Sequence, residues 1–351
     1  MLGVLWNLFL FVIILSVIVF IHELGHFTWA KICGVYVYEF SIGMGPKLFG
    51  KKVGETEYNV RLIPIGGFCS MAGEDLQADD DEKIPKDKRL QSKNVFQRFL
   101  IMFFGPGNNF ILALVLLFFI ALIWGGTTLD PVVSEVLDKY PAEEAGISSG
   151  DRILEINGQK VSTSDDVSLY LAVANTKKTN KIKVVKPNGY EVSYEVQPKK
   201  VKQDGKEGYY FGITMTQEKT HGILEAFKYT GMKFASLIKQ MFLTVKYLVT
   251  GGIGLNQLSG PVGIYNVVGQ QSKAGLSSIL FLVAYLSINV GFLNLLPIPA
   301  FDGGHILFIL IEMIRRKPVN PNVENIIHTV GLASLMILML FVTIHDIIML
   351  F

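Results

Sequence analysis

The chain has 351 residues, of which 50% are hydrophobic and 18% are charged, and its formal net charge is +2. This balance favours a multi-pass membrane protein that carries a water-soluble insert, and it gives no reason to expect a nucleic-acid partner. The two cysteines, Cys33 and Cys69, both follow the first apolar run, and neither has a second cysteine at Cys-x-x-Cys spacing. We therefore predict free thiols in a reducing compartment.

The first apolar run, residues 4–21, is long enough to enter and nearly cross a bilayer. It lacks a basic start and a small-residue cleavage site, so we predict a retained transmembrane helix rather than a signal peptide. The run ends in Ile21-His22-Glu23-Leu24-Gly25-His26. In one helix over residues 4–30, His22 and His26 lie one turn apart on one face and can bind a single Zn²⁺, with Glu23 beside the metal's water.

Two histidines four residues apart can also be ordinary surface or core residues. A His-Glu-His match of this kind arises by chance in on the order of one chain in a hundred of this length. Ionisable side chains in an apolar spanning segment, however, each cost about 2.5–3.5 kcal/mol on insertion scales, which makes them candidates for a functional site. We interpret the motif as a metal site.

The chain then changes its pattern. Residues 35–40 and 57–62 are β-branched and aromatic, and residues 43–46 and 64–67 have turn composition, which predicts hairpins beside the end of the first helix. Residues 74–93 are dense in charge and predict a solvated loop. A second span is predicted at about 96–124. Its Gly105–Phe110 stretch fits either close packing between helices or a polar site lined by asparagines, and the sequence does not separate the two.

Residues 127–215 have short β-like runs divided by turn residues, and they predict a water-soluble domain. Residues 222–250 have the spacing of an amphipathic helix that lies along the bilayer surface. A break is predicted at 258–264. A third span follows at about 279–296, is interrupted at 294–305 and resumes over 306–313, and a fourth occupies about 330–351. The predicted domains are 1–126, 127–215 and 216–351.

Basic residues predict the orientation. They gather in the loop between the first two spans and at Arg315–Lys317, and no lysine or arginine precedes the first span. By the positive-inside rule these loops are cytoplasmic, so the N-terminus, the soluble domain and the C-terminus lie on the other side of the membrane.

The interruption of the third span supplies a third candidate ligand. Non-helical backbone at membrane depth is tolerated only where it is buried in protein or lines a watered cavity. Asp302 lies in such a break and would complete a two-histidine, one-carboxylate set with an open position for water. An aspartate that only caps a helix is the alternative, but acids in membranes seldom lack a partner. His305 could also reach a metal, and we rank it below Asp302 because a carboxylate suits a hydrolytic site.

These motifs together resemble the site-2 protease family of intramembrane zinc metalloproteases, in its bacterial form with one PDZ domain. The resemblance covers most of the chain in the same order. It is carried by His22–His26, by Gly105–Phe110, by Asn294…Pro297…Pro299…Asp302-Gly303-Gly304-His305, by Gly43–Leu48 followed by Pro64–Gly67, and by the PDZ-like Gly146–Gly158.

The resemblance implies a polytopic α-helical protein of about four spans, with a cytoplasmic-side membrane-re-entrant β-loop and an inserted α/β PDZ domain at 127–215. It implies cleavage of peptide bonds in or near the transmembrane segments of single-pass proteins, signalling proteins or signal-peptide remnants, usually after a first extracytoplasmic cut. The location would be a bacterial plasma membrane, and a peptide or C-terminus could bind the PDZ domain. The implied substrate-binding residues are Asn294, Asn109, Gly43, Gly45 and Pro297.

In the mechanism that follows, Glu23 accepts a proton from zinc-activated water and passes it to the leaving amine. The main alternative is a catalytically silent PDZ membrane scaffold with a structural zinc site, which should have four protein ligands where the sequence offers three and the weaker His305. An ion transporter with broken helices is a further alternative. Against it, only one span is interrupted, and neither alternative explains why Glu23 stands beside His22.

Overall fold

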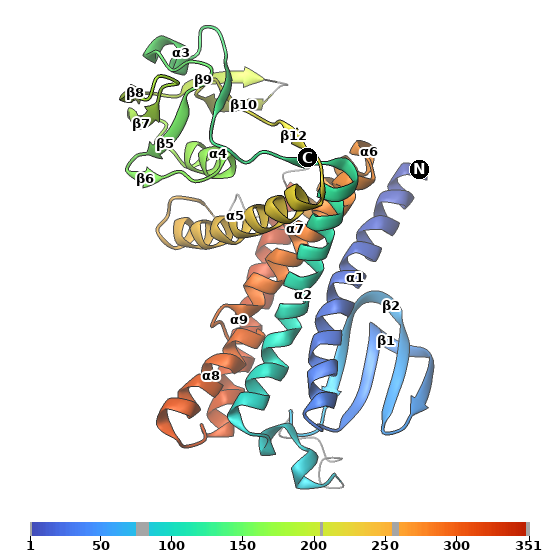
Figure 1. Ribbon diagram of the computed structural model, residues 1–351. Helices are drawn as coiled ribbons and strands as arrows, with labels where there is room; N and C mark the ends of the chain where they lie inside the picture. Colours follow the sequence, from blue (N-terminus) through green and yellow to red (C-terminus); the bar gives the residue numbers. More distant parts are fainter. Residues whose placement is uncertain (1, 75–83, 204–205, 255–259, 349–351) are drawn as a thin grey trace. The chain divides into compact units, whose positions relative to one another are not determined.

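The computed structural model describes residues 2–74, 84–203, 206–254 and 260–348. The chain forms two compact units, Met1–Leu116 with Leu255–Phe351, and Leu117–Gly254 (Figure 1). The second unit contains the predicted soluble domain together with the predicted amphipathic helix. The sequence analysis instead grouped that helix with the C-terminal membrane part.

The first unit is built mainly from long apolar helices. Its elements are α1 (Leu2–Ile32), β1 (Val37–Val53), β2 (Thr56–Met71), the 3₁₀ turns η2 (Lys86–Lys88) and η3 (Leu90–Ser92), α2 (Val95–Trp124) as far as Leu116, α6 (Pro261–Ala274), α7 (Leu276–Leu295), α8 (Asp302–Arg315) and α9 (Pro321–Ile348). Within the described residues, α1, α2, α7 and α9 are long and apolar enough to cross a membrane. By length and composition, these four helices confirm the prediction of a multi-pass membrane protein with about four spans.

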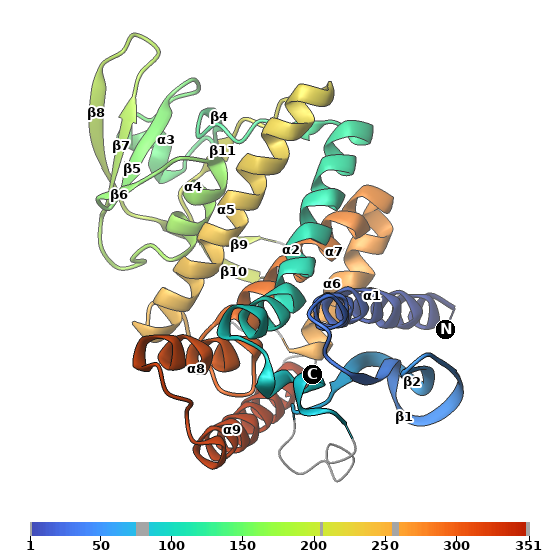
Figure 2. The ribbon, with the colours of Figure 1, turned by 60° about the horizontal axis from the view of Figure 1, so that its bottom comes forward.

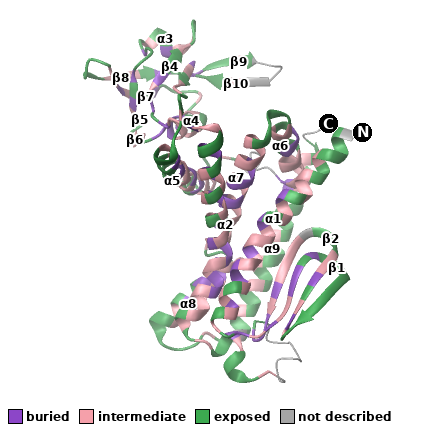
Figure 3. Cartoon of the chain, turned by 45° about the vertical axis from the view of Figure 1, so that its right-hand side comes forward, coloured by how far each residue is buried: buried purple, intermediate pink, exposed green. Residues whose placement is uncertain are grey.

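Many residues of α1 and α9 are exposed (Figure 3), and large apolar side chains are among them. Trp6 on α1 is 55% exposed and Ile337 on α9 is 71% exposed. In water such surfaces would favour aggregation or association. In a bilayer they face lipid tails, so their exposure fits the membrane location.

The two long strands β1 and β2 form one folded-back sheet beside α1 (Figure 2). Residues 39–42 pair with 57–60 and also with 67–70, while 47–53 pair with 56–61. The chain therefore reverses direction near residues 43–46 and 62–66, close to the predicted turns. Gly43, Gly45 and Gly66 have φ of +83°, +83° and +86°, a conformation that glycine adopts without steric cost.

Helix α6 was not predicted, because the sequence analysis took residues 258–264 as a break. Residues 255–259 lie outside the described part, and Pro261 is the first residue of α6, where its missing N–H is not needed. The Gly263 N–H near this start donates to Asp346 Oδ2 on α9 at 2.9 Å. Buried Val268 packs with Ile14 of α1 and with α7, so α6 belongs to the helical core.

Between α7 and α8 the backbone is not helical over 296–301, so the third span is interrupted as predicted but over fewer residues than the predicted 294–305. Gly303 follows this break at the start of α8, and a Cβ there would collide with the Leu296 and Leu295 carbonyl oxygens. The glycine thus allows α8 to begin directly against the end of α7. The predicted solvated loop 74–93 lies partly outside the described residues, and in its described part Leu90 is buried.

The second unit is rich in short strands. Its elements are β3 (Gly126–Thr127), β4 (Val133–Val136), α3 (Pro141–Ala145), β5 (Arg152–Ile156), β6 (Gln159–Lys160), α4 (Ser164–Ala172), β7 (Asn180–Val185), β8 (Glu191–Val196), β9 (Lys199–Gln203), β10 (Lys206–Tyr210), β11 (Ile213–Met215), β12 (Lys219–Thr220) and α5 (Ile223–Val249). An antiparallel sheet has the order β6-β5-β7-β8. Asn157 and Gly158, with φ of +51° and +78°, form its tight β5–β6 turn.

Helix α5 matches the predicted amphipathic segment closely, and ion pairs attach it to α4. Lys233 Nζ lies 2.7 Å from Asp165 Oδ2, and Lys239 Nζ lies 2.8 Å from Asp166 Oδ2. Asp166 is fully buried and also accepts from the Thr163 N–H in a capping box. These contacts explain why α5 groups with the strand-rich segment.

The buried Asp151 makes the second unit sensitive to loss of its lysine partner. Lys186 Nζ lies 2.8 Å from Asp151 Oδ2. Burial opposes the lysine's charge, but the bond to Asp151 outweighs it, so the pKa of Lys186 lies above its usual value of 10.5. This stabilisation is therefore complete below pH 10.5 and is lost only as pH rises through the raised pKa.

We expect Lys186→Met to lower the free energy of unfolding by about 1–3 kcal/mol at neutral pH, because it leaves a buried carboxylate short of a partner. Thermal unfolding of the intact protein in detergent measures this. The control is Lys183→Met, which breaks the exposed pair with Glu191 and should cost at most about 1 kcal/mol. Equal losses in the two variants would show that the Asp151 pair is not special.

Candidate metal centre

Three side chains from distant parts of the chain meet inside the first unit. His22 and His26 lie on α1, and Asp302 is the first residue of α8. His22 Nε2 is 3.2 Å from Asp302 Oδ2, His26 Nε2 is 3.4 Å from Asp302 Oδ1, and the two Nε2 atoms are 3.2 Å apart. Both histidines are buried. The ligands predicted from the sequence are thus brought together.

The arrangement fits a zinc ion. Two donors that are each about 2.0–2.1 Å from a tetrahedral zinc lie roughly 3.3 Å apart, which agrees with the three separations. Asp302 Oδ2 is buried and makes no hydrogen bond in the described structure, although His22 Nε2 lies 3.2 Å away. An orphaned carboxylate oxygen is costly unless something else binds it. A cation held by these three side chains removes that cost.

Partners behind the two histidines orient their rings. His26 Nδ1 donates to the Ile101 carbonyl oxygen of α2 at 2.8 Å, which leaves its Nε2 lone pair free for a metal. His22 Nδ1 lies 3.3 Å from the side-chain amide of Asn109, which is fully buried. A 180° turn of that amide offers its carbonyl oxygen to an Nδ1–H. Ser287 of α7 donates to the Asn109 backbone carbonyl at 3.0 Å and so fixes this residue.

Glycines let α1 and α2 approach closely at the same level. A Cβ on Gly25 would collide with the Phe104 carbonyl oxygen, and a Cβ on Gly105 would enter the His26 ring. Helices without side chains at the contact can bring their backbones together, which is common in membranes. The two sequence interpretations of Gly105–Phe110 therefore both describe this structure, since its glycines pack the helices and Asn109 reaches the candidate ligands.

Gly25→Ala should destabilise this contact. The added methyl group would lie 2.5 Å from the Phe104 carbonyl carbon and 2.9 Å from the Gly105 nitrogen, both backbone atoms that cannot move aside. Overpacking of this kind costs about 1–3 kcal/mol. We expect a lower thermal unfolding midpoint in detergent. Gly3→Ala on the same helix is the control, because a Cβ there meets nothing within 4 Å, and an equal loss in both variants would refute the close contact.

Glu23 is on α1 and lies beside the three candidate ligands. Strand β2 passes next to it. A Cβ on Gly67 would lie 3.7 Å from Glu23 Cγ, in ordinary van der Waals contact. The 67–70 segment of β2 pairs with β1, and no other strand pairing is found for it in the described part of the chain. Strand and carboxylate are therefore neighbours at the metal centre.

The other predicted site residues lie on three further segments of the first unit. Asn294 is half-buried in the last turn of α7, Pro297 is exposed in the break that follows, and Gly43 and Gly45 lie in the reversal of β1. His305 does not join the ligands, because it faces α9, where its Nδ1 is 3.3 Å from Glu324 Oε1.

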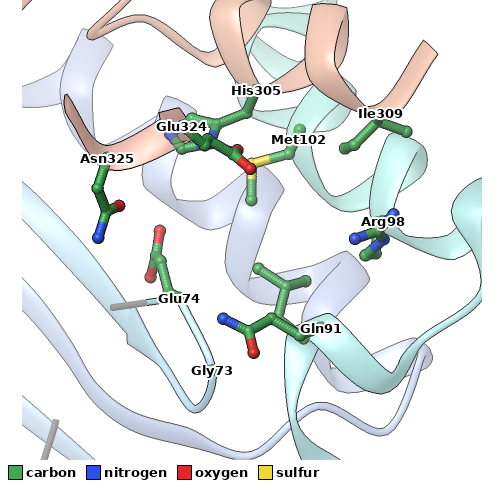
Figure 4. Close-up of a pocket in the computed structure, with 10 residues that line it drawn as sticks. Gly73, Glu74, Gln91, Arg98, Met102, His305, Ile309, Glu324 and Asn325 are labelled. Atoms are coloured by element: carbon green, nitrogen blue, oxygen red, sulfur yellow. The ribbon is translucent and has the colours of Figure 1, made fainter. Parts of the chain in front are cut away.

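His305 and Glu324 line a separate cavity of about 90 Å³, shown in Figure 4. Arg98 of α2 lines the same cavity and forms an ion pair with Glu312 of α8. The pair ties α2 to α8, the helix that carries Asp302. The cavity is thus a neighbour of the metal centre and is not formed by its ligands.

The geometry agrees with what the chain is similar to. The model of peptidase family M50 matches residues 10–338. The chain belongs to peptidase family M50. This is the site-2 protease family, so the family predicted from the motifs is confirmed, while the PDZ domain stays a prediction.

Curated relatives support the same assignment for this M50 peptidase. A Clostridium perfringens protein is 40% identical over 334 residues, which cover 95% of this chain and 96% of the relative. "Regulator of sigma-W protease RasP" of Bacillus subtilis is 34% identical over 413 aligned residues, and "Zinc metalloprotease RasP" of Bacillus licheniformis is 34% identical over 412. Each of these two alignments covers 96% of this chain and 97% of the relative. The M50 peptidase is therefore a multi-pass membrane zinc metalloendopeptidase.

Sequence reasoning missed three groups in this M50 peptidase. Two, the Ile101 carbonyl and Ser287, lie behind the histidine ligands, and the third, His328 of α9, accepts from the Ala300 N–H in the segment before Asp302. A backbone carbonyl such as that of Ile101 leaves no trace in a sequence. Ser287 is a single hydroxyl in an apolar helix, which is too common to single out. His328 was overlooked because the last span was predicted to begin at residue 330, although Glu324 and His328 stand four residues apart before it.

Proposed function

We propose that this peptidase hydrolyses peptide bonds within or near the transmembrane segments of single-pass membrane proteins, with His22, His26 and Asp302 holding zinc and Glu23 acting as general base. The observation that carries the proposal is a three-ligand set with a carboxylate beside it, in which two of the ligands, His22 and His26, lie on a helix that can span a membrane. Catalytic zinc sites keep three protein ligands and an open position, whereas structural sites are closed by four. The scaffold alternative is disfavoured on this ground.

Bound zinc would supply a Lewis acid and make water acidic enough to lose a proton at neutral pH. Glu23 accepts that proton and delivers it to the amine that leaves when the peptide C–N bond breaks. Burial of His22 and His26 excludes bulk water from the ligands. Asn109 and the Ile101 carbonyl hold the two rings in place, so we assign Asn109 to ligand orientation as well as to substrate binding.

The substrate must be extended at the point of cleavage, because a helical peptide bond is shielded by its own helix. The outer edge of the 67–70 segment pairs with no further strand in the described residues, and the Cys69 backbone there donates to Glu23. An extended substrate strand can add at this edge through backbone hydrogen bonds and replace the bond at Cys69. Gly43, Gly45, Asn294 and Pro297 remain proposed substrate contacts. The β1–β2 sheet would then be the re-entrant β-loop on the cytoplasmic side.

We further propose a bacterial plasma membrane location with residues 127–215 as an extracytoplasmic PDZ domain that receives a peptide or C-terminus. The relatives named above are bacterial, and one is named "Regulator of sigma-W protease RasP", which supports a signalling protein as the substrate. We propose that this substrate has first been cut on its extracytoplasmic side. The start of α1 and the end of α9 lie at one end of the first unit (Figure 1), as an even number of spans requires. The remaining proposed domains are 1–126 and 216–351.

Removal of the metal tests the proposal directly. A tagged single-span membrane protein, trimmed on its extracytoplasmic side, is incubated with the purified peptidase in detergent. A zinc chelator should abolish cleavage, and added zinc should restore it, because the ligand set alone cannot activate water. Cleavage that persists in a sample shown to contain no zinc would overturn the proposed role of the three ligands.

A further inference from the structure

The segment that delivers Asp302 to the metal centre contains a strained residue. Residues 296–301 connect α7 to α8, and within them Ala300 has φ of +79°. Residues other than glycine rarely adopt this left-handed conformation, and they keep it only where surrounding structure holds them. Something must therefore fix Ala300, two residues before Asp302.

Helix α9 makes two contacts that can do this. The Ala300 N–H donates to His328 Nδ1 at 3.0 Å. One turn further along α9, Gly331 lies directly under Pro299, and a Cβ at Gly331 would be 2.8 Å from the Pro299 carbonyl oxygen. The His328 contact binds the backbone of the connecting segment. The missing side chain of Gly331 lets that segment lie against α9.

The His328 ring is also in contact with α8. It stacks on His305 of α8 with ring centroids 3.9 Å apart and planes 14° from parallel. A Cβ on Gly304 would be 3.0 Å from His328 Cε1, so α8 also approaches closely. His305 is in turn fixed by Glu324, the pair visible at the cavity in Figure 4. The acceptor nitrogen therefore has a fixed position.

His305, Glu324 and His328 place candidate ligand atoms within 4.8 Å of one another, a set that could hold a second metal ion. The hydrogen bond argues against this. Because Nδ1 of His328 accepts a hydrogen bond from the Ala300 N–H, the neutral ring carries its own proton on Nε2 and has no free lone pair there. A ligand histidine does the opposite, since it donates from the nitrogen that faces the protein.

We propose that His328 is a positioning residue that holds Ala300 in its strained conformation and thereby fixes Asp302 for zinc. This inference rests on the proposed role of Asp302 as a ligand. It predicts that His328 governs how firmly zinc is held, although it does not touch the metal. Loss of an outer partner of a metal ligand typically weakens metal binding about 10–100-fold.

The test measures the rate at which zinc leaves the purified, zinc-loaded protein for a chelator. His328→Ala removes the acceptor and should speed release about tenfold or more. His328→Asn keeps an acceptor oxygen near the position of Nδ1 and should release zinc at close to the wild-type rate. Ala300→Gly should suppress the His328→Ala defect, because glycine adopts positive φ without being held.

Two comparisons make the outcome specific. His345→Ala removes a histidine from the same helix and should leave the release rate unchanged. Asp302→Asn should speed release strongly. If Asp302→Asn does not release zinc faster than the wild type, the proposed ligand set is wrong. If Asp302→Asn releases zinc faster but His328→Ala releases it at the wild-type rate, only the positioning role is refuted.

Equal acceleration in His328→Ala and His345→Ala would mean general loosening of α9 and would also overturn the proposal. The proposal would also be overturned if the wild type bound two zinc ions and His328→Ala bound one, because His328 would then be a metal ligand. If His328→Ala does not fold, Gly331→Ala replaces it, because its added methyl group displaces Pro299 while His328 stays. Unchanged zinc release in a folded Gly331→Ala would count against the positioning of this segment by α9.

Discussion

Glu23→Gln is expected to lower the rate of peptide cleavage by about 10²–10⁴-fold while the protein keeps its zinc. Glutamine has the size of glutamate but cannot take a proton from water, and Glu23 is not one of the three ligands that meet at the metal centre. The measurement compares initial cleavage rates of a tagged single-span substrate in detergent and counts bound zinc in the same samples.

A surface carboxylate of the same unit provides the control for this variant. Glu55 pairs with Lys31 at 2.7 Å on a partly exposed surface, and Glu55→Gln should change cleavage little. If Glu23→Gln cuts as fast as the wild type, another group is the base. If it loses zinc, Glu23 belongs to the ligand set and the assignment of roles is wrong.

Asp302→Asn should abolish cleavage together with zinc binding. The change removes the only carboxylate of the ligand set and leaves two histidines, which is fewer than the three protein ligands of catalytic zinc sites. The loss of zinc affinity should exceed the about 10–100-fold effect of outer partners, because a direct bond is lost. Zinc content after dialysis against a weak chelator measures it.

Asp346→Asn is the matched control in the same unit. Asp346 accepts from the Gly263 N–H, and an asparagine oxygen can accept the same bond. Zinc content should therefore stay at the wild-type level. An Asp302→Asn protein that retains full zinc would show that the carboxylate only caps α8, the alternative that the sequence analysis considered.

The predictions that agree best with the structure are those of single helices whose side-chain pattern has one physical cause. The apolar run and the His22–His26 spacing predicted a long helix, and α1 extends over Leu2–Ile32. The amphipathic spacing of 222–250 gave nearly the observed bounds of α5. In both cases the pattern of apolar and polar side chains reflects the solvent around a single helix, so the local sequence is sufficient to predict the helix.

The features that were missed depend on contacts between distant segments. Pro261 reads as a breaker in isolation, yet it begins α6 because Asp346, more than eighty residues later, binds its first turn. His305 looked like a candidate ligand from its place after Asp302, but its ring turns to Glu324 and His328 of α9. From the sequence alone, Asn109 could either hydrogen-bond between packed helices or line a polar site. The structure shows its side-chain amide near His22 of α1. Spacing along the chain carries no information on such pairs.

The position of the cut is the most direct test of the central claim. A single-span substrate with uniform membrane and flanking sequences is digested by the zinc-loaded peptidase, and the masses of both products are determined. Cleavage between residues of the substrate's transmembrane segment or immediately at its edge is the predicted result, and it should be absent with Glu23→Gln. Cleavage confined to the distant water-exposed flanks would contradict an intramembrane protease and require a different account of the metal centre.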